Sequence, residues 1–136
     1  MMQRWASPPI RQNQPVKGYM KYQDVEAKTR EDLVVLLDSN DALKIAAALY
    51  SATYHDRDWK WVQGQCLRFI RYSDTRVRWA AATCLGDLAV FHKTLDLDAV
   101  RPILEEALRD DASVRSAAED SLDLIRQNVS TDRRVT

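Results

Sequence analysis

The two histidines are the first residues to consider for chemistry, because the charge of histidine changes near neutral pH and its ring is the commonest metal ligand. His55 and His92 each lie near the expected C-terminus of a helix, where a cation interacts well with the helix dipole. His55 with Asp56 and Asp58 is the one combination of metal-ligand types at close spacing. Adjacent carboxylates are common in loops, so we interpret this set as an ordinary polar turn and predict no metal site.

The sequence contains no familiar catalytic motif. It has no G-x-S-x-G turn, no phosphate-binding loop and no C-x-x-C pair. Cys66 and Cys84 lie within apolar helical patterns and have no activating residue beside them in the sequence, which favours buried free thiols in a reducing compartment over a disulfide. We therefore predict a protein that is not an enzyme and that needs no cofactor.

The charge balance restricts the classes of partner. The 136 residues include 20 acidic and 20 basic side chains, so global electrostatics favour neither nucleic acid nor an anionic membrane. No apolar run approaches the roughly 18 residues of a membrane span. The N-terminus is polar and interrupted by Pro8 and Pro9, unlike a secretory signal. These observations predict a cytoplasmic protein.

Amphipathic helices must position whatever surface the chain presents. Three glycines and four prolines are too few for an all-β fold built on tight turns. The patterns predict helices over about residues 29–37, 41–54, 59–72 and 74–91, a fifth capped by Asp98 and a sixth capped by Asp111. In 74–91, the apolar residues fall in one arc when they are placed at roughly 100° per residue. The chain is therefore predicted to be all-α.

The second, fourth and sixth helices repeat one pattern. A polar cap, two residues, an aliphatic residue and a base recur, with Leu43, Val77 and Val114 as the aliphatic positions, 34 and 37 residues apart. On this alignment Lys44, Arg78 and Arg115 are the bases. Recurrence at near-constant spacing, each time after another amphipathic helix, predicts three stacked helix pairs.

This pattern resembles the HEAT-repeat family. The family's D-x-x-V-R signature is present as Asp74, Val77 and Arg78, and again from Asp111, whereas the first copy departs from it at Asn40. The resemblance implies a short right-handed α-solenoid of three HEAT-like pairs over residues 29–127. The prolines of the N-terminal region predict an extended arm over 1–28, and residues 128–136 are expected to form a frayed tail. The resemblance also implies that the aspartates and arginines form a structural ladder between repeats.

The face of the fourth helix opposite its apolar arc is the candidate binding surface. Trp79, Thr83, Gly86 and Val90 share this face, and in HEAT-like stacking it lines the concave side. The repeat alignment adds positions from the second and sixth helices. The predicted partner-binding residues are Ile45, Leu49, Trp79, Thr83, Val90, Glu119, Asp120 and Asp123. The alternative is that the N-terminal arm covers the apolar part of this face.

A nucleic-acid interface is a second alternative. Arg68, Arg71, Arg76 and Arg78 lie near one expected turn within a repeat, and a basic patch attracts phosphate. The carboxylates of the sixth helix and the zero net charge argue against this interpretation.

The chain also resembles small standalone HEAT-repeat proteins of bacteria, including immunity proteins encoded beside polymorphic or contact-dependent toxins. The resemblance lies in the size, the repeat count, and the stretches Y-H-D-R-D-W at 54–59 and A-A-T-C-L-G-D-L-A at 81–89. It implies a non-catalytic module that binds a cognate toxin domain and covers its active site, and a basic toxin would suit the acidic end of the surface. A scaffold or adaptor subunit is the remaining alternative. The sequence leaves the partner's identity and the oligomeric state open.

Overall fold

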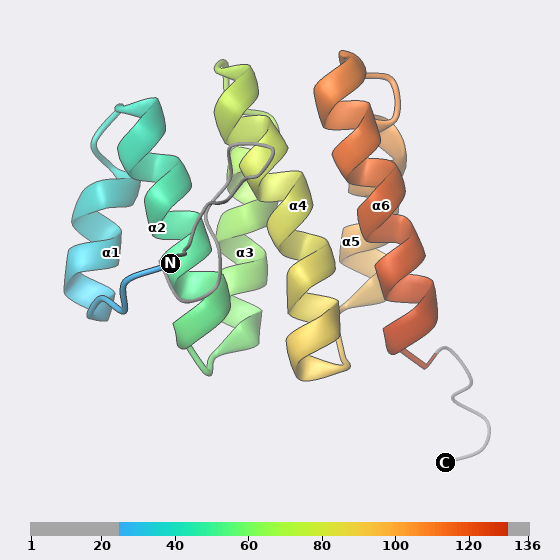
Figure 1. The fold of residues 1–136 in the computed structure, drawn as a ribbon, viewed down its shortest axis with the longest axis horizontal. Helices are drawn as coiled ribbons and strands as arrows, with labels where there is room; N and C mark the ends of the chain where they lie inside the picture. Colours follow the sequence, from blue (N-terminus) through green and yellow to red (C-terminus); the bar gives the residue numbers. More distant parts are fainter. Residues whose placement is uncertain (1–24, 131–136) are drawn as a thin grey trace, which may run out of the picture.

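The protein is all-α, as predicted. The structure, a computed structural model, describes residues 25–130, and within this range it contains six helices. They are α1 (Arg30–Leu37), α2 (Ala42–His55), α3 (Trp59–Phe69), α4 (Thr75–His92), α5 (Leu97–Ala107) and α6 (Ala112–Asn128). Figure 1 shows α2, α4 and α6 side by side in one layer, with α3 and α5 behind them and α1 beside α2. Successive helices therefore form three stacked pairs.

Polar side chains begin most of the helices at the predicted residues. Thr29, Asp58 and Asp74 each accept a hydrogen bond from a backbone N–H in the first turn of the helix that follows. Such caps satisfy N–H groups that have no partner within the helix. The predicted cap of α5 is wrong, because Asp96 rather than Asp98 caps this helix.

The apolar faces of α3, α4 and α6 supply a large part of the core. The buried residues of these faces are Val62, Cys66, Phe69, Ile70, Val77, Ala81, Cys84, Leu85, Leu88, Val114, Ala117, Ala118 and Ile125. Both cysteines are free and buried, as predicted, and burial raises the pKa of the Cys84 thiol, which also hydrogen-bonds Cys66.

The orientation of α2 differs from the prediction. Leu43, expected inside, is 65% exposed, whereas Ile45 and Leu49 are fully buried. The core therefore repeats from Ile45 to Val77, a spacing of 32 residues rather than 34. Aligning Leu43 with Val77 placed the first copy two residues out of register, which turns a helix by about half a turn.

Helices α4 and α6 approach closely at Gly86. A Cβ atom on this glycine would lie 2.5 Å from Ser121 Oγ and 2.9 Å from Ser121 Cα. The Ser121 hydroxyl donates a hydrogen bond to the carbonyl oxygen of Ala82 at 2.6 Å. Gly86 is buried in this contact, so the prediction that it shares the accessible face of α4 is wrong.

The chain that leads into α1 is attached to α2. Val25 is buried, its carbonyl oxygen lies 2.7 Å from His55 Nε2, and the Ser51 hydroxyl donates to the carbonyl oxygen of Glu26 at 2.6 Å. The rest of the predicted arm, residues 1–24, and the end of the predicted tail, residues 131–136, lie outside the described residues. Val129, which was placed in the tail, is buried against the core. Over residues 25–130, no helix has the length and apolar character needed to cross a membrane.

Candidate partner-binding surface

Four aromatic side chains lie in a row where α2 and α4 meet. The ring centroids of Trp79 and Tyr50 are 6.5 Å apart, those of Tyr50 and Tyr54 are 6.2 Å apart, and those of Tyr54 and Phe91 are 5.3 Å apart in an edge-to-face arrangement. These distances are in the range of favourable aromatic pairs. We call the four residues the aromatic row.

A carboxylate lies at the Tyr54 end of the aromatic row. The Tyr54 hydroxyl donates a hydrogen bond to Asp87 Oδ2 at 3.3 Å. Partial burial raises the pKa of Asp87 to about 6, and the hydrogen bond from Tyr54 only partly opposes this shift. Among residues 25–130, no lysine, arginine or histidine forms an ion pair with Asp87.

The predicted surface residues of α4 lie next to these groups. Trp79, Thr83 and Val90 are half-buried on the same side of α4 as Asp87. The structure corrects the contribution of α2, because the fully buried Ile45 and Leu49 cannot contact a partner. On α2, Tyr54 is half-buried beside these α4 residues, whereas Tyr50 is buried.

The acidic residues of α6 are exposed, as an interacting surface requires. Glu119 and Asp120 form no ion pair with any residue of the described range, whereas Asp123 pairs with Arg126 one turn later. This pairing reduces the negative charge that Asp123 contributes. The acidic part of the surface therefore rests mainly on Glu119 and Asp120.

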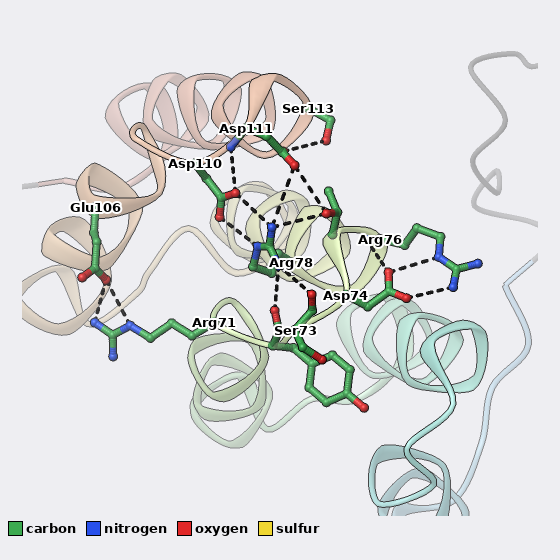
Figure 2. Close-up of polar contacts among 11 residues, drawn as sticks. Arg71, Ser73, Asp74, Arg76, Arg78, Glu106, Asp110, Asp111 and Ser113 are labelled. Atoms are coloured by element: carbon green, nitrogen blue, oxygen red, sulfur yellow. Dashed lines mark hydrogen bonds and ion pairs between the residues drawn. The ribbon is translucent and has the colours of Figure 1, made fainter.

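The arginines that suggested a nucleic-acid interface are paired with carboxylates. Ion pairs join Arg68 to Asp38 at 3.0 Å, Arg71 to Glu106 at 2.6 Å, Arg76 to Asp74 at 2.8 Å and Arg78 to Asp110 at 2.9 Å. Figure 2 shows the last three pairs around the turns that precede α4 and α6. A phosphate would have to compete with a carboxylate at each arginine, which weakens the case for nucleic acid.

Arg78 joins two repeats. Its guanidinium donates to both carboxylate oxygens of Asp110, and also to the backbone carbonyl oxygens of Tyr72 and Ser73 at 2.9 and 3.1 Å (Figure 2). These bonds hold the pKa of the Asp110 carboxyl below its usual range. The Arg78–Asp110 pair thus forms one contact of the predicted ladder between repeats. A groove of about 490 Å³ lies beside this pair, and Arg78 and Asp110 form part of its lining.

The His55 turn is also structural. The His55 ring faces the Val25 carbonyl oxygen, and the carboxylates of Asp56 and Asp58 pair with Arg30 at 3.2 and 3.6 Å. The Arg30 guanidinium lies 3.8 Å from the ring centroid of Trp61. These contacts fasten the start of α1 to the turn between α2 and α3. No group of three or more potential ligands in the described range is arranged to hold a metal ion.

Sequence reasoning missed Tyr50, Tyr54 and Asp87. Two tyrosines four residues apart share one face of a helix, and Asp87 follows Thr83 by the same interval. The signal for Asp87 was therefore present on the helical wheel of α4. The signal for the tyrosines was missed because the repeat alignment gave α2 the wrong orientation.

Comparison with known proteins identifies relatives by fold and by sequence. The family model for HEAT repeats matches residues 30–123. One chain in the crystal structure of a CDI complex from Cupriavidus taiwanensis LMG 19424 is 29% identical, with a TM-score of 0.68, over 81% of this chain and 98% of that chain. No curated protein is significantly similar.

Proposed function

Because this chain belongs to the HEAT-repeat family, we propose that it is a non-catalytic protein-binding module, and more narrowly an immunity protein that binds and neutralises a toxin domain. Stacked helical repeats present an extended surface on which a protein partner can lie. The fold thus supports the general part of this proposal, and the narrower part needs a separate observation.

The similarity to a chain of the CDI complex is the observation that supports an immunity role. It extends over nearly the whole of that chain, and its identity of 29% is more than a shared fold alone requires. Contact-dependent inhibition involves a toxin and the immunity protein that blocks it. A chain that shares this fold over 98% of the other chain's length is well suited to the immunity role.

The composition of the candidate surface, formed by the aromatic row and the acidic residues of α6, is consistent with this role. Tryptophan and tyrosine are enriched among the residues that contribute most to protein interfaces, and Trp79 and Tyr54 belong to the aromatic row. Glu119 and Asp120 add negative charge on α6. A partner with exposed basic residues would complement this surface.

Co-expression tests the proposal. The gene immediately upstream is inspected first, and any toxin domain that it encodes is the probe. We expect this domain to stop the growth of a bacterial host, and co-expression of this chain to restore growth. The two purified proteins should form a complex of defined stoichiometry. If no toxin domain is encoded there, or if growth is not restored, the immunity function is wrong.

Substitution of Trp79 tests the surface. Trp79→Ala should raise the dissociation constant at least tenfold, since loss of a buried aromatic anchor commonly costs about 2 kcal/mol of binding. Val35→Ala is the matched control, because Val35 is an apolar residue on α1 that is 70% exposed. Equal dissociation constants for the two variants would place the interface elsewhere.

A further inference from the structure

The environment of Asp87 differs from that of Asp110, another half-buried carboxylate. Asp110 is matched by the guanidinium of Arg78 and by its hydrogen bonds. Within residues 25–130, Asp87 accepts a hydrogen bond from a neutral hydroxyl, and no cation pairs with it. A carboxylate that is partly withdrawn from water without a counter-ion is unfavourable for folding. Its position is therefore better explained by binding than by stability.

We propose that Asp87, with the rings of Tyr54 and Phe91 beside it, is a receptor for an arginine side chain of the protein partner. This inference rests on the proposed function, and it names the chemistry that the partner brings to the surface. The arginine guanidinium is planar, weakly hydrated and able to stack on aromatic rings while it donates hydrogen bonds. It therefore matches a carboxylate that is bordered by rings better than the compact, strongly hydrated ammonium of lysine does.

The local geometry leaves part of the carboxylate available. The Tyr54 hydroxyl bonds to Oδ2, so Oδ1 and the second lone pair of Oδ2 can accept bonds from a guanidinium. Tyr54 and Phe91 meet edge to face at 5.3 Å, which fixes the orientation of both rings. Tyr54 comes from α2, whereas Asp87 and Phe91 come from α4, so two packed helices hold the three groups in place.

Small arginine derivatives test this inference without the partner. The probes are N-acetyl-arginine amide and the neutral, nearly isosteric N-acetyl-citrulline amide, which are added to the full chain at millimolar concentrations. NMR follows the carboxyl carbon of Asp87 and the ring signals of Tyr54. We expect saturable shifts with the arginine derivative, and shifts at least tenfold weaker with the citrulline derivative or in Asp87→Asn.

Controls separate this site from general attraction to negative charge. Glu105→Gln, which removes an exposed carboxylate from α5, should leave the response to arginine unchanged. Asp87→Asn keeps an oxygen that can accept the Tyr54 bond, so it should fold, and thermal unfolding checks this. An equal response to citrulline, a response retained in Asp87→Asn, or stronger shifts at α6 than at Asp87 would overturn the inference.

The toxin assay distinguishes failure of this inference from failure of the proposed function. If the wild-type chain neutralises the toxin and Asp87→Asn does so with an unchanged dissociation constant, the arginine receptor is wrong and the immunity function stands. If the wild-type chain neutralises no toxin but binds the arginine derivative at Asp87, the immunity function is wrong and the receptor stands. With both correct, Asp87→Asn should weaken the complex at least tenfold.

Discussion

Two half-buried carboxylates, Asp110 and Asp87, have pKa values that are shifted in opposite directions. Arg78 has a carboxylate partner, and the pKa of that partner, Asp110, is lowered by the hydrogen bonds between them. Asp87 has a tyrosine hydroxyl as its partner, and burial raises its pKa to about 6. The difference depends on the formal charge of the neighbour, since a cation stabilises a carboxylate far more than a neutral donor does. The two residues therefore have opposite effects on the dependence of stability on pH.

The raised pKa of Asp87 predicts a stability difference between the wild type and Asp87→Asn that changes with pH. Because the folded-state pKa is above the ordinary value of 3.8, the stabilising contribution of Asp87 is present at low pH and is lost as pH rises from about 4 to about 6. Relative to the variant, the wild type should lose about 1–2 kcal/mol between pH 4 and pH 7.5. Urea unfolding measures this difference, and an NMR titration midpoint of Asp87 below 4 would contradict it.

Removal of the Arg78 side chain should destabilise the fold. Arg78 and Asp110 are 18% and 21% exposed, so Arg78→Ala leaves a carboxylate and two carbonyl oxygens short of their donor and should cost about 1–3 kcal/mol. The wild-type pair contributes at neutral pH, and its contribution disappears as pH falls through the lowered pKa of Asp110.

A neighbouring arginine provides the control for Arg78. Arg76 also pairs with an aspartate, but it is 63% exposed, so Arg76→Ala should reduce stability much less than Arg78→Ala does. Urea unfolding at pH 7 compares the two variants. Equal losses of stability would show that the Arg78–Asp110 pair contributes no more than an ordinary surface ion pair.

At the scale of helices, the packing of α4 on α6 depends on Gly86. In Gly86→Ala the new methyl group would lie 2.9 Å from the Cα atom of Ser121, so the two backbones must move apart, at a cost of about 1–3 kcal/mol. Gly64 on α3 is the matched control, because a Cβ there meets no atom within 4 Å. Gly64→Ala should stabilise the protein by about 0.5–1 kcal/mol. Thermal unfolding of both variants checks the opposite signs.

The helices differ in how well their sequences predicted their orientation. In α3 and α6, polar and apolar residues follow a clear helical period, and the apolar face of each helix is the one that is buried. In α2, alanines occupy both faces, so periodicity gave little contrast and the repeat alignment decided the orientation. The Leu43-Lys44 pair imitates the Val77-Arg78 pair, but Asp41 rather than Asn40 caps α2. The capping residue therefore indicates the position of α2 better than the repeat alignment does.

At the scale of the whole molecule, the sequence predicted the architecture more completely than the binding surface. The repeat spacing predicted that the second, fourth and sixth helices are equivalent, and α2, α4 and α6 lie side by side in one layer (Figure 1). The hydrogen bond between Tyr54 and Asp87 joins residues 33 positions apart on different helices. Such a contact depends on the relative rotation of α2 and α4, which a two-residue error in register is enough to change.

The uneven distribution of charge over the molecule predicts how its complex should respond to salt. The chain has no net charge, but Glu119 and Asp120 give α6 exposed negative groups, which should accelerate encounter with a basic toxin domain. The double variant Glu119→Gln/Asp120→Asn should lower the association rate constant severalfold at low salt and change the dissociation rate constant little.

Trp79→Ala should mainly increase the dissociation rate constant, because its contact forms after encounter. Surface plasmon resonance at about 20 and 300 mM salt separates these effects. Screening by salt should abolish the effect of the double variant on the association rate constant and leave the effect of Trp79→Ala on the dissociation rate constant. An association rate that is insensitive to both the substitutions and salt would remove α6 from the interface.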